Sequence, residues 1–340
     1  MCKRILASQT NTEEGVPFYK IGTIGNAPDA YISKELFDDY KTKYNYPHKG
    51  EVMITCAGTV GKCVIYDGKD AYYQDSNIVW IDNPSQCISN SFLYHLLAKV
   101  DWRKLNSTTI IRIYNDDLRN LKLSYPQIEE QQKISRLLSF LDERIVTQNK
   151  IIDKLQSLIK GIRNDVYGKL RKSVGFNAMI SDVLSYEQPQ PYIVENTEYT
   201  AEGIPVLTAN KAFVLGYTSE INGIYDKGDC IIFDDFTLDC KYVDFPFKVK
   251  SSAIKILTAK NKELLRYTFE FLKYLDLSTE EHKRHYIAEI QNQEFILPTM
   301  HIVSTIAHAF SALSLRMESV VKQRNMFETQ KQYLLRQMFI

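Results

Sequence analysis

Apolar residues recur at alternating steps of four and three from Ile134 to Val166, and the polar Gln148 is the single interruption. Such a heptad pattern predicts a long helix with a coiled-coil seam, here over residues 127–168. At about 1.5 Å per residue this helix would be roughly 60 Å long, about twice the width of a small domain, so we expect a spacer. The predicted seam positions are Ile134, Leu138, Leu141, Ile145, Ile152, Leu155 and Ile159.

A second long helix is predicted over residues 299–340. It carries Arg324 and Lys331 where the first helix has Ile152 and Ile159, so its apolar seam is weaker. We expect the two helices to pair antiparallel as a coiled coil, with a globular domain at each end. The alternative, in which each helix covers its own domain, remains open. The predicted seam positions of the second helix are Ile306, Phe310, Leu313 and Met317.

The sequence contains an internal repeat, and one copy precedes each of these helices. Residues 92–126 align with residues 264–298 without a gap, at a constant offset of 172, and both copies contain an Arg-x-Tyr motif. Two further matches lie upstream in the same order. Lys49-Gly50-Glu51 matches Lys227-Gly228-Asp229, which places Val52 on Cys230, and Gly15-Val16-Pro17 matches Gly203-Ile204-Pro205. The repeat predicts the order domain, helix, domain, helix, with boundaries at 1–125, 126–172, 173–297 and 298–340.

Each predicted domain has short β-rich segments separated by Gly, Asp, Asn and Pro. One helix per copy is predicted, over residues 90–100 and 262–275, which gives an α+β domain. The fold class we predict is therefore α+β, with two tandem domains separated by two long helices that form an antiparallel coiled coil. The predicted strands are residues 52–55, 63–66, 77–81, 231–233 and 253–257.

The charge of the chain is balanced overall but uneven along its length. The 42 Lys and Arg against 41 Asp and Glu leave a net charge of +1, so a site for nucleic acid must be local. Residues 126–172 carry 10 basic and 6 acidic residues, whereas residues 173–297 carry 12 basic and 19 acidic residues. An acidic second domain must therefore confine its positive contacts to a small face.

The remaining composition favours a soluble protein of the cytoplasm. The six cysteines form no C-x-x-C pair, and no apolar run reaches the 18 residues of a membrane span. The amino-terminal residues lack the apolar core of a signal peptide. We therefore expect neither a metal site nor a membrane partner.

The Gly-rich stretch Ala57 to Lys62 resembles a phosphate-binding loop but has only two residues between its glycines, and Cys63 follows the lysine. Two interpretations remain: a tight hairpin, or a glycine loop that brings the backbone and Lys62 close to DNA. No spacing typical of a nuclease, a methyltransferase or a metal site occurs elsewhere. The sequence predicts no catalytic residues.

Recognition of DNA is the function that the loops favour. Amides, hydroxyls and cations beside aromatic residues can contact base edges and phosphates. Arg and Tyr of the repeated motif are the stronger candidates because both copies keep them; packing of the tyrosine on the arginine stem is the alternative. The candidates are Lys20, Thr59, Lys62, Gln74, Ser76, Asn77, Arg112 and Tyr114 in the first copy, and Asn210, Lys211, Lys250, Ser251, Arg284 and Tyr286 in the second.

The organisation resembles the specificity subunit of type I restriction-modification systems over the whole chain. Residues 125–145 (YPQIEEQQKISRLLSFLDERI) are close to that family's helix opening, and residues 49–62 and 73–76 resemble part of a target recognition domain. Residues 202–205 and 231–237 resemble a second such domain. The resemblance implies that each domain recognises one half of a split target in double-stranded DNA and that the helices fix the gap.

The resemblance also implies partners. The helices would dock two methyltransferase subunits, with Glu129, Glu130 and Gln131 at the first docking site. Those subunits would use S-adenosylmethionine, and restriction subunits would use ATP and Mg²⁺. This chain would hold no cofactor and would not be an enzyme. A coiled-coil scaffold or inhibitor that binds the modification machinery without recognising DNA is the alternative function, and a stand-alone nuclease is a distant third.

Two departures from the family pattern stand out. Only 14 residues precede Gly15, so the first copy has no counterpart of residues 179–196, and its amino end is shortened. Either the start is trimmed or the carboxyl end supplies the missing edge. The second helix begins Pro298-Thr299-Met300 without the Glu-Glu-Gln sequence, so we expect a weaker second docking site.

Overall fold

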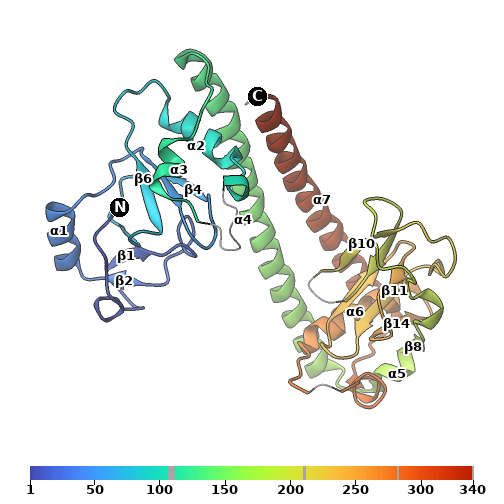
Figure 1. Cartoon of the computed structure of the whole chain (residues 1–340). Coiled ribbons are helices and arrows are strands. Elements are labelled where there is room, and N and C mark those ends of the chain that lie inside the picture. Colours follow the sequence, from blue (N-terminus) through green and yellow to red (C-terminus); the bar gives the residue numbers. More distant parts are fainter. Residues whose placement is uncertain (106–111, 210–211, 282, 339–340) are drawn as a thin grey trace. The chain divides into compact units, whose positions relative to one another are not determined.

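The computed structural model describes residues 1–105, 112–209, 212–281 and 283–338. The chain divides into two compact units. The first unit is Met1–Thr147 with Arg324–Ile340, and the second is Gln148–Gln323. Both long helices contribute to both units (Figure 1). No helix of the described residues has the length and apolar character needed to cross a membrane.

The first unit contains two three-stranded sheets. One has the order β2-β1-β5, in which β1 (Val16–Tyr19) pairs antiparallel with β2 (Tyr31–Ile32) and parallel with β5 (Tyr72–Tyr73). The other has the order β4-β3-β6 and is antiparallel throughout. Its strands are β4 (Cys63–Ile65), β3 (Val52–Thr55) and β6 (Ile78–Ile81).

Helix α2 (Asn90–Lys99) covers the second of these sheets. Ser89 caps it by accepting a hydrogen bond from the Phe92 amide, which satisfies one of the free donors of the first turn. On one side α2 buries Leu93 and Leu97 with β3, and on the other Phe92 and Leu96 pack against the long helices. The short α3 (Asn115–Arg119) follows.

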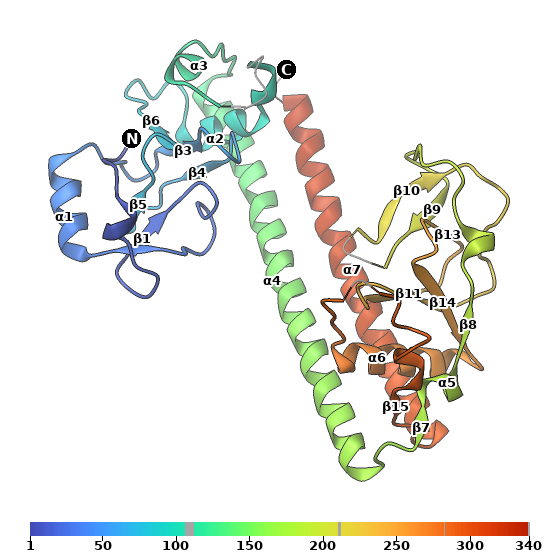
Figure 2. The same ribbon diagram turned by 60° about the horizontal axis from the view of Figure 1, so that its bottom comes forward.

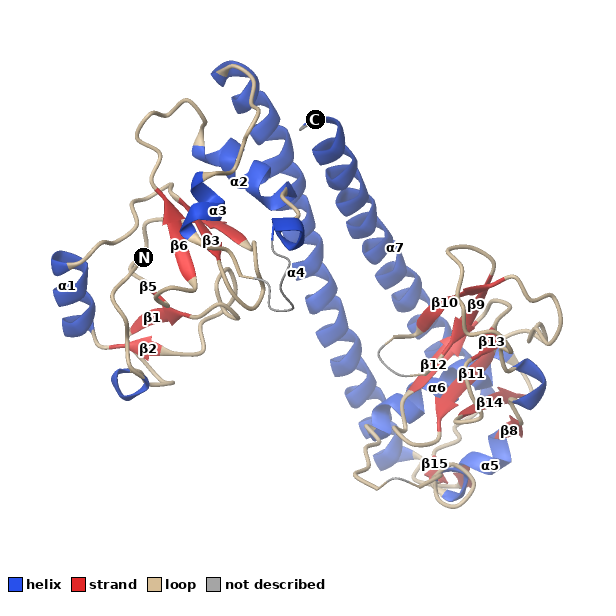
Figure 3. Cartoon of the chain, in the orientation of Figure 1, coloured by secondary structure: helices blue, strands red, loops and turns tan. Residues whose placement is uncertain are grey.

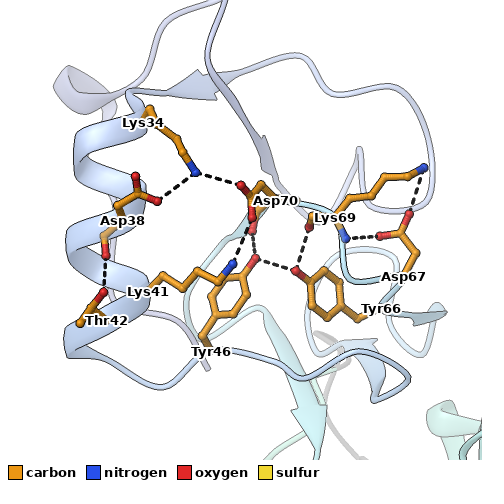
Figure 4. A network of polar contacts seen from close by, with 10 residues as sticks. Lys34, Asp38, Lys41, Thr42, Tyr46, Tyr66, Asp67, Lys69 and Asp70 are labelled. Carbon is orange, nitrogen blue, oxygen red and sulfur yellow. Dashed lines mark hydrogen bonds and ion pairs between the residues drawn. The ribbon is translucent and has the colours of Figure 1, made fainter.

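Helix α1 (Lys34–Lys43) was not predicted from the sequence. This segment has too few apolar residues to give a clear helical pattern, and Phe37 is its only buried residue. Lys34 and Lys41 both pair with Asp70, at 2.9 and 3.0 Å, which attaches the helix to the loop before β5 (Figure 4). The prediction of one helix per copy is therefore wrong for the first copy.

The second unit repeats the two sheets of the first (Figure 3). In the order β10-β9-β13, β9 (Ile204–Leu207) pairs antiparallel with β10 (Val214–Thr218) and parallel with β13 (Lys248–Val249). The second sheet, β12-β11-β14-β8, has one strand more. Its strands are β12 (Cys240–Val243), β11 (Cys230–Asp234), β14 (Ile254–Ala259) and β8 (Leu184–Glu187).

Four further elements belong to the second unit. Helix α6 (Lys262–Leu275) packs on β12, β11 and β14, as α2 packs on its sheet (Figure 2). The strands β7 (Ala178–Met179) and β15 (Glu294–Phe295) pair antiparallel, and the one-turn α5 (Ile180–Val183) joins β7 to β8. These short elements were missed because two-residue strands carry no periodic pattern.

The repeat is visible in single backbone positions. Gly15 and Gly203 both have φ of +127°, and a Cβ at either position would collide with the carbonyl oxygen of the neighbouring strand, at Ile32 or Thr218. Only glycine fits both constraints. The same local structure thus opens β1 and β9.

The alignment of the central strands needs a shift of one residue. Val52 and Ile54 face α2, and their structural counterparts facing α6 are Ile231 and Phe233. Placing Val52 on Cys230 was therefore wrong by one position. Because side chains alternate between the faces of a strand, this shift decides which residues meet the helix.

The long helices are α4 (Ile128–Ser173) and α7 (Met300–Met338), close to the predicted bounds. Their starts lie 172 residues apart, the offset of the sequence repeat. Within the first unit, Asp142 of α4 forms an ion pair with Lys331 of α7. Within the second, Gln148 contacts Gln323, and Arg163 lies 5.8 Å from the ring centre of Phe310.

In the second unit the residue number therefore rises along α4 as it falls along α7. In the first unit Leu138 clusters with Leu335 beside the Asp142–Lys331 pair, so the pairing is antiparallel there too. All the predicted seam residues are buried or half-buried, whereas their neighbours Leu137, Val146 and Ile151 are exposed. The α+β class and the antiparallel helix pairing are confirmed.

Candidate nucleic-acid interface

Three loops of the first unit converge at the ends of its strands. Gln74, in the loop between β5 and β6, accepts a hydrogen bond from the Ile21 amide at 3.3 Å. The side chain of Lys62, from the turn between β3 and β4, lies against the backbone of Gly25. The structure thus brings the predicted residues Lys62 and Gln74 to the loop that follows Lys20.

The glycine stretch is the hairpin turn between β3 and β4. The Gly61 amide donates to the Thr55 carbonyl at 2.9 Å, and the Lys62 amide donates to the Thr55 hydroxyl at 3.0 Å. Gly61 has φ of +83°, and a Cβ there would collide with the indole of Trp102. The hairpin interpretation is confirmed. Thr59 is exposed at its tip.

Arg112 joins this surface from the Arg-x-Tyr motif. Its Nη2 donates to the Ser76 carbonyl at 3.3 Å, and its guanidinium lies 5.9 Å from the ring centre of Tyr114, which is 59% exposed. Between them, Ile113 is buried, and its amide donates to the Cys56 carbonyl at 2.9 Å. The middle residue therefore attaches the motif to the end of β3, and its two neighbours face outward.

The second unit has the equivalent arrangement. The middle residue His285 donates its amide proton to the Asp235 carbonyl at 3.2 Å, at the end of β11. Arg284 donates from Nη2 to the Ser252 hydroxyl at 3.3 Å. Ser252 is the structural counterpart of Ser76, because the β13–β14 loop has the same length as the β5–β6 loop. The contact between the motif arginine and this serine is thus duplicated.

The two tyrosines of the motif differ. Tyr286 is 1% exposed, and its ring packs on Phe233 and Tyr186, so a contact with DNA would require the core to open. The buried Asp235 carboxylate accepts from the amides of His285 and Tyr286, at 3.0 and 2.7 Å, and holds the tyrosine inward. In place of Tyr286, the exposed Phe236 lies against Arg284, with 6.0 Å to the ring centre.

Arg284 and Lys250 place positive charge on this face. Several other lysines of the second unit are neutralised by a nearby carboxylate, for example Lys248 by Glu220 at 2.7 Å and Lys255 by Asp235 at 3.2 Å. Within the described ranges no carboxylate pairs with Arg284 or Lys250. Lys250 lies in the β13–β14 loop and Arg284 contacts Ser252 of that loop, so the two leave positive charge there in a domain with an acidic composition.

The other predicted residues are placed as follows. Lys20 forms an ion pair with Asp29 at 3.1 Å. The backbone carbonyl of the half-buried Asn77 accepts a hydrogen bond from the Cys56 amide. Ser251 is exposed beside Lys250. Asn210 and Lys211 lie outside the described residues. Sequence patterns missed Phe236 and Ser252, although Ser252 occupies the position of Ser76 in the repeat.

The three predicted docking residues differ in their exposure to solvent. Glu129 and Glu130 are exposed in the first turn of α4, where their charge complements the helix dipole. Gln131 is fully buried. Its side chain accepts from the Ser89 amide at 2.8 Å and donates to the carbonyls of Cys87 and Pro126, both at 2.9 Å. Gln131 thus fastens the start of α4 to the segment before α2 and has little capacity left for a partner.

Comparison with known proteins agrees with this architecture. Residues 1–157 match the family model described as the type I restriction modification DNA specificity domain. A putative type I restriction enzyme specificity subunit from Haemophilus influenzae is 48% identical over 160 residues. Residues 1–157 therefore belong to the type I specificity-domain family, and the chain is similar to specificity subunits of type I restriction-modification systems.

Other specificity subunits extend the likeness. The specificity subunit of the Escherichia coli EcoR124I/EcoR124II enzyme is 44% identical over 126 residues. The H. influenzae match covers 47% of this chain and the E. coli match 35%, and the chain spans only 41% and 31% of the length of these relatives. A crystal structure of the S subunit from M. genitalium aligns with 100% of this chain and 92% of its own, with a TM-score of 0.68 at 16% identity, which shows a shared fold.

Proposed function

We propose that the chain is a specificity subunit, a non-catalytic DNA-recognition protein whose two domains each recognise one half of a split target. The observation that carries the proposal is the duplicated contact of Arg112 with Ser76 and of Arg284 with Ser252. Each contact holds an arginine beside the loop that leads into β6 or β14. Arginine held in this way is suited to a guanine edge or a phosphate.

Partner subunits supply the chemistry in this proposal. Two methyltransferase subunits dock on the long helices and use S-adenosylmethionine, and restriction subunits use ATP and Mg²⁺. The exposed Glu129 and Glu130 lie on the docking surface, whereas Gln131 shapes it from within. The antiparallel helices fix the distance between the two half-sites, in the cytoplasm of the host.

Selection from a random duplex library tests the proposal, with the methyltransferase subunits present. We expect enrichment of two short motifs separated by a fixed gap, and affinity that falls steeply as salt rises. Recovery of a single contiguous motif would contradict recognition by two domains. Assembly with the methyltransferase subunits but no DNA binding at low salt would favour the scaffold function instead.

A further inference from the structure

Each unit keeps an aromatic ring beside its motif arginine, but the two rings come from different places in the repeat. In the first unit the ring belongs to Tyr114, 5.9 Å from the guanidinium of Arg112. In the second unit the motif tyrosine, Tyr286, is buried, and Phe236 of the β11–β12 turn lies 6.0 Å from the guanidinium of Arg284. Two different routes lead to the same pair of side chains, which favours a task for the ring over a remnant of the duplication.

One exchange at the end of the central strand accounts for the difference. The register of the central strands places Cys56 on Asp235 and Ala57 on Phe236. The Asp235 carboxylate accepts hydrogen bonds from two amides of the motif and holds Tyr286 in the core, whereas a cysteine side chain is only a weak acceptor. The next residue of the turn then carries the exposed ring, as Phe236, where the first unit has the methyl group of an alanine.

The ring of Phe236 is held at the surface by an ordered turn. Oδ1 of Asp234 accepts hydrogen bonds from the amides of Phe236 and Thr237, at 2.9 and 3.0 Å. On the other side of the turn, Leu238 is buried, and its amide donates to the Asp234 carbonyl at 3.0 Å. The ring remains 38% exposed although both sides of the turn are fastened. A side chain placed in this way loses little conformational entropy when it binds a partner.

Arg284 is available for a contact with a base. It is exposed, its Nη2 donates to the Ser252 hydroxyl, and its Nε and Nη1 have no hydrogen-bond partner within the described ranges. The carboxylates of the neighbouring turn do not neutralise it, because Asp234 accepts from amides and Asp235 pairs with Lys255 at 3.2 Å. Its remaining N–H groups can therefore donate to O6 and N7, the two acceptors of a guanine in the major groove.

The contact between ring and guanidinium determines which base pair the ring meets. A guanidinium that forms two hydrogen bonds with a guanine lies in the plane of that base pair. Because the Arg284 guanidinium lies over the face of the Phe236 ring, the ring is displaced towards a neighbouring base pair, about 3.4 Å away along the duplex. A phenylalanine ring has no hydrogen-bonding atom, and the apolar group that the major groove presents is the C5-methyl group of thymine. The ring and this methyl group are complementary.

We propose that Phe236 and Arg284 recognise two adjacent base pairs of one half-site, a guanine through Arg284 and the methyl group of a neighbouring thymine through Phe236. This inference rests on the proposed function, because it assigns base contacts within a surface that recognises DNA. It makes Phe236 a specificity-determining residue of the second unit. The corresponding ring of the first unit, Tyr114, ends in a hydroxyl group, so the two half-sites are recognised with different chemistry.

Replacement of single bases tests both contacts. The probe is the split duplex recovered from the random library, bound to the full chain together with the methyltransferase subunits. Deoxyuridine replaces each thymidine in turn, which removes the methyl group and keeps the base pair. In a second series 7-deazaguanine replaces each guanine in turn, which removes the N7 acceptor. Fluorescence anisotropy at constant salt measures the affinity of each duplex.

We expect one thymidine at which deoxyuridine weakens binding about three- to fivefold, as for the loss of one buried methyl group. In Phe236→Ala the same replacement should change affinity by less than about twofold, because the apolar partner of the methyl group is absent. In the adjacent base pair, 7-deazaguanine should weaken binding about fivefold, and this dependence should disappear in Arg284→Ala. Phe176→Ala is the matched control, since Phe176 is 37% exposed and lies 5.3 Å from Arg171; it should keep the full dependence on the methyl group.

Several results would overturn this inference and leave recognition of DNA intact. These are no thymidine at which deoxyuridine matters, a dependence on the methyl group that Phe236→Ala retains, or a sensitive thymidine and guanine in base pairs that are not adjacent. Weaker binding by Phe236→Ala with equal affinity for the thymidine and deoxyuridine duplexes would make Phe236 a positioning residue for Arg284. A complex that selects no split motif, or binds no DNA at low salt, would overturn the proposed function and this inference with it.

Discussion

Gln148 of α4 donates a hydrogen bond to Gln323 of α7, and it occupies the one polar position of an otherwise apolar seam. The donor–acceptor distance is 3.4 Å, and the buried Gln148 Oε1 has no hydrogen-bond partner within the described residues. A polar pair of this kind specifies the register of a coiled coil at a cost in stability. The Gln148–Gln323 pair therefore specifies the register of the two helices in the second unit.

Replacing this residue by leucine should stabilise the protein. Gln148→Leu removes the unsatisfied oxygen and extends the apolar seam, so the free energy of unfolding should rise by about 1 kcal/mol. Chemical denaturation followed by circular dichroism measures the change. Gln156→Leu, on the exposed face of the same helix, is the matched control and should change the free energy by less than about 0.5 kcal/mol. If Gln148→Leu instead lowered the free energy of unfolding, the claim that this polar pair reduces stability would be wrong.

Arg284 offers a direct test of DNA recognition. Arg284→Ala should weaken binding to the cognate duplex by about 1–3 kcal/mol, because a base or phosphate contact is lost, without changing the unfolding transition. Arg316→Ala, an exposed arginine of α7, should leave affinity nearly unchanged. Electrophoretic mobility shifts with the assembled complex measure both. Equal affinity of Arg284→Ala and the unsubstituted chain would assign Arg284 to packing on Phe236.

Gln131 should prove structural. Gln131→Ala leaves the Ser89 amide and the carbonyls of Cys87 and Pro126 without their partner, so we expect a loss of about 1–3 kcal/mol of unfolding free energy. Gln132→Ala, at the next and exposed position, should cost less than about 0.5 kcal/mol. Thermal unfolding separates the two. If Gln131→Ala instead reduced only the binding of methyltransferase subunits, the residue would belong to the docking surface.

The sequence predicted the long-period features of this fold and missed the short ones. The heptad pattern located α4 and α7 to within a few residues because the seam is a local repetition. Strands such as β7 and β15 have two residues each and exist through pairing between segments more than 100 residues apart. The inward turn of Tyr286 likewise depends on Asp235, 51 residues earlier, so the matching motif around Tyr114 gave no indication of it.

His95 should make the stability of the protein depend on pH. It is 1% exposed on α2, and this burial lowers the pKa of its imidazole to about 4. The carboxylate of Asp142 on α4 opposes the shift, and the ammonium of Lys331 on α7 adds to it. The unfolded chain, with an ordinary histidine pKa of about 6.5, therefore binds a proton before the folded chain does.

The sign follows from that order of protonation. Stability attributable to His95 is fully present above about pH 6.5 and is lost as the pH falls towards about 4, by up to about 3 kcal/mol. His95→Phe keeps a buried ring but removes the proton site, so its unfolding free energy should fall less steeply between pH 6.5 and 4. His301→Phe, at an exposed position of α7, is the matched control and should keep the original slope. Urea denaturation at half-unit steps of pH measures the slopes; identical slopes for His95→Phe and the unsubstituted chain would mean that His95 binds its proton equally in both states.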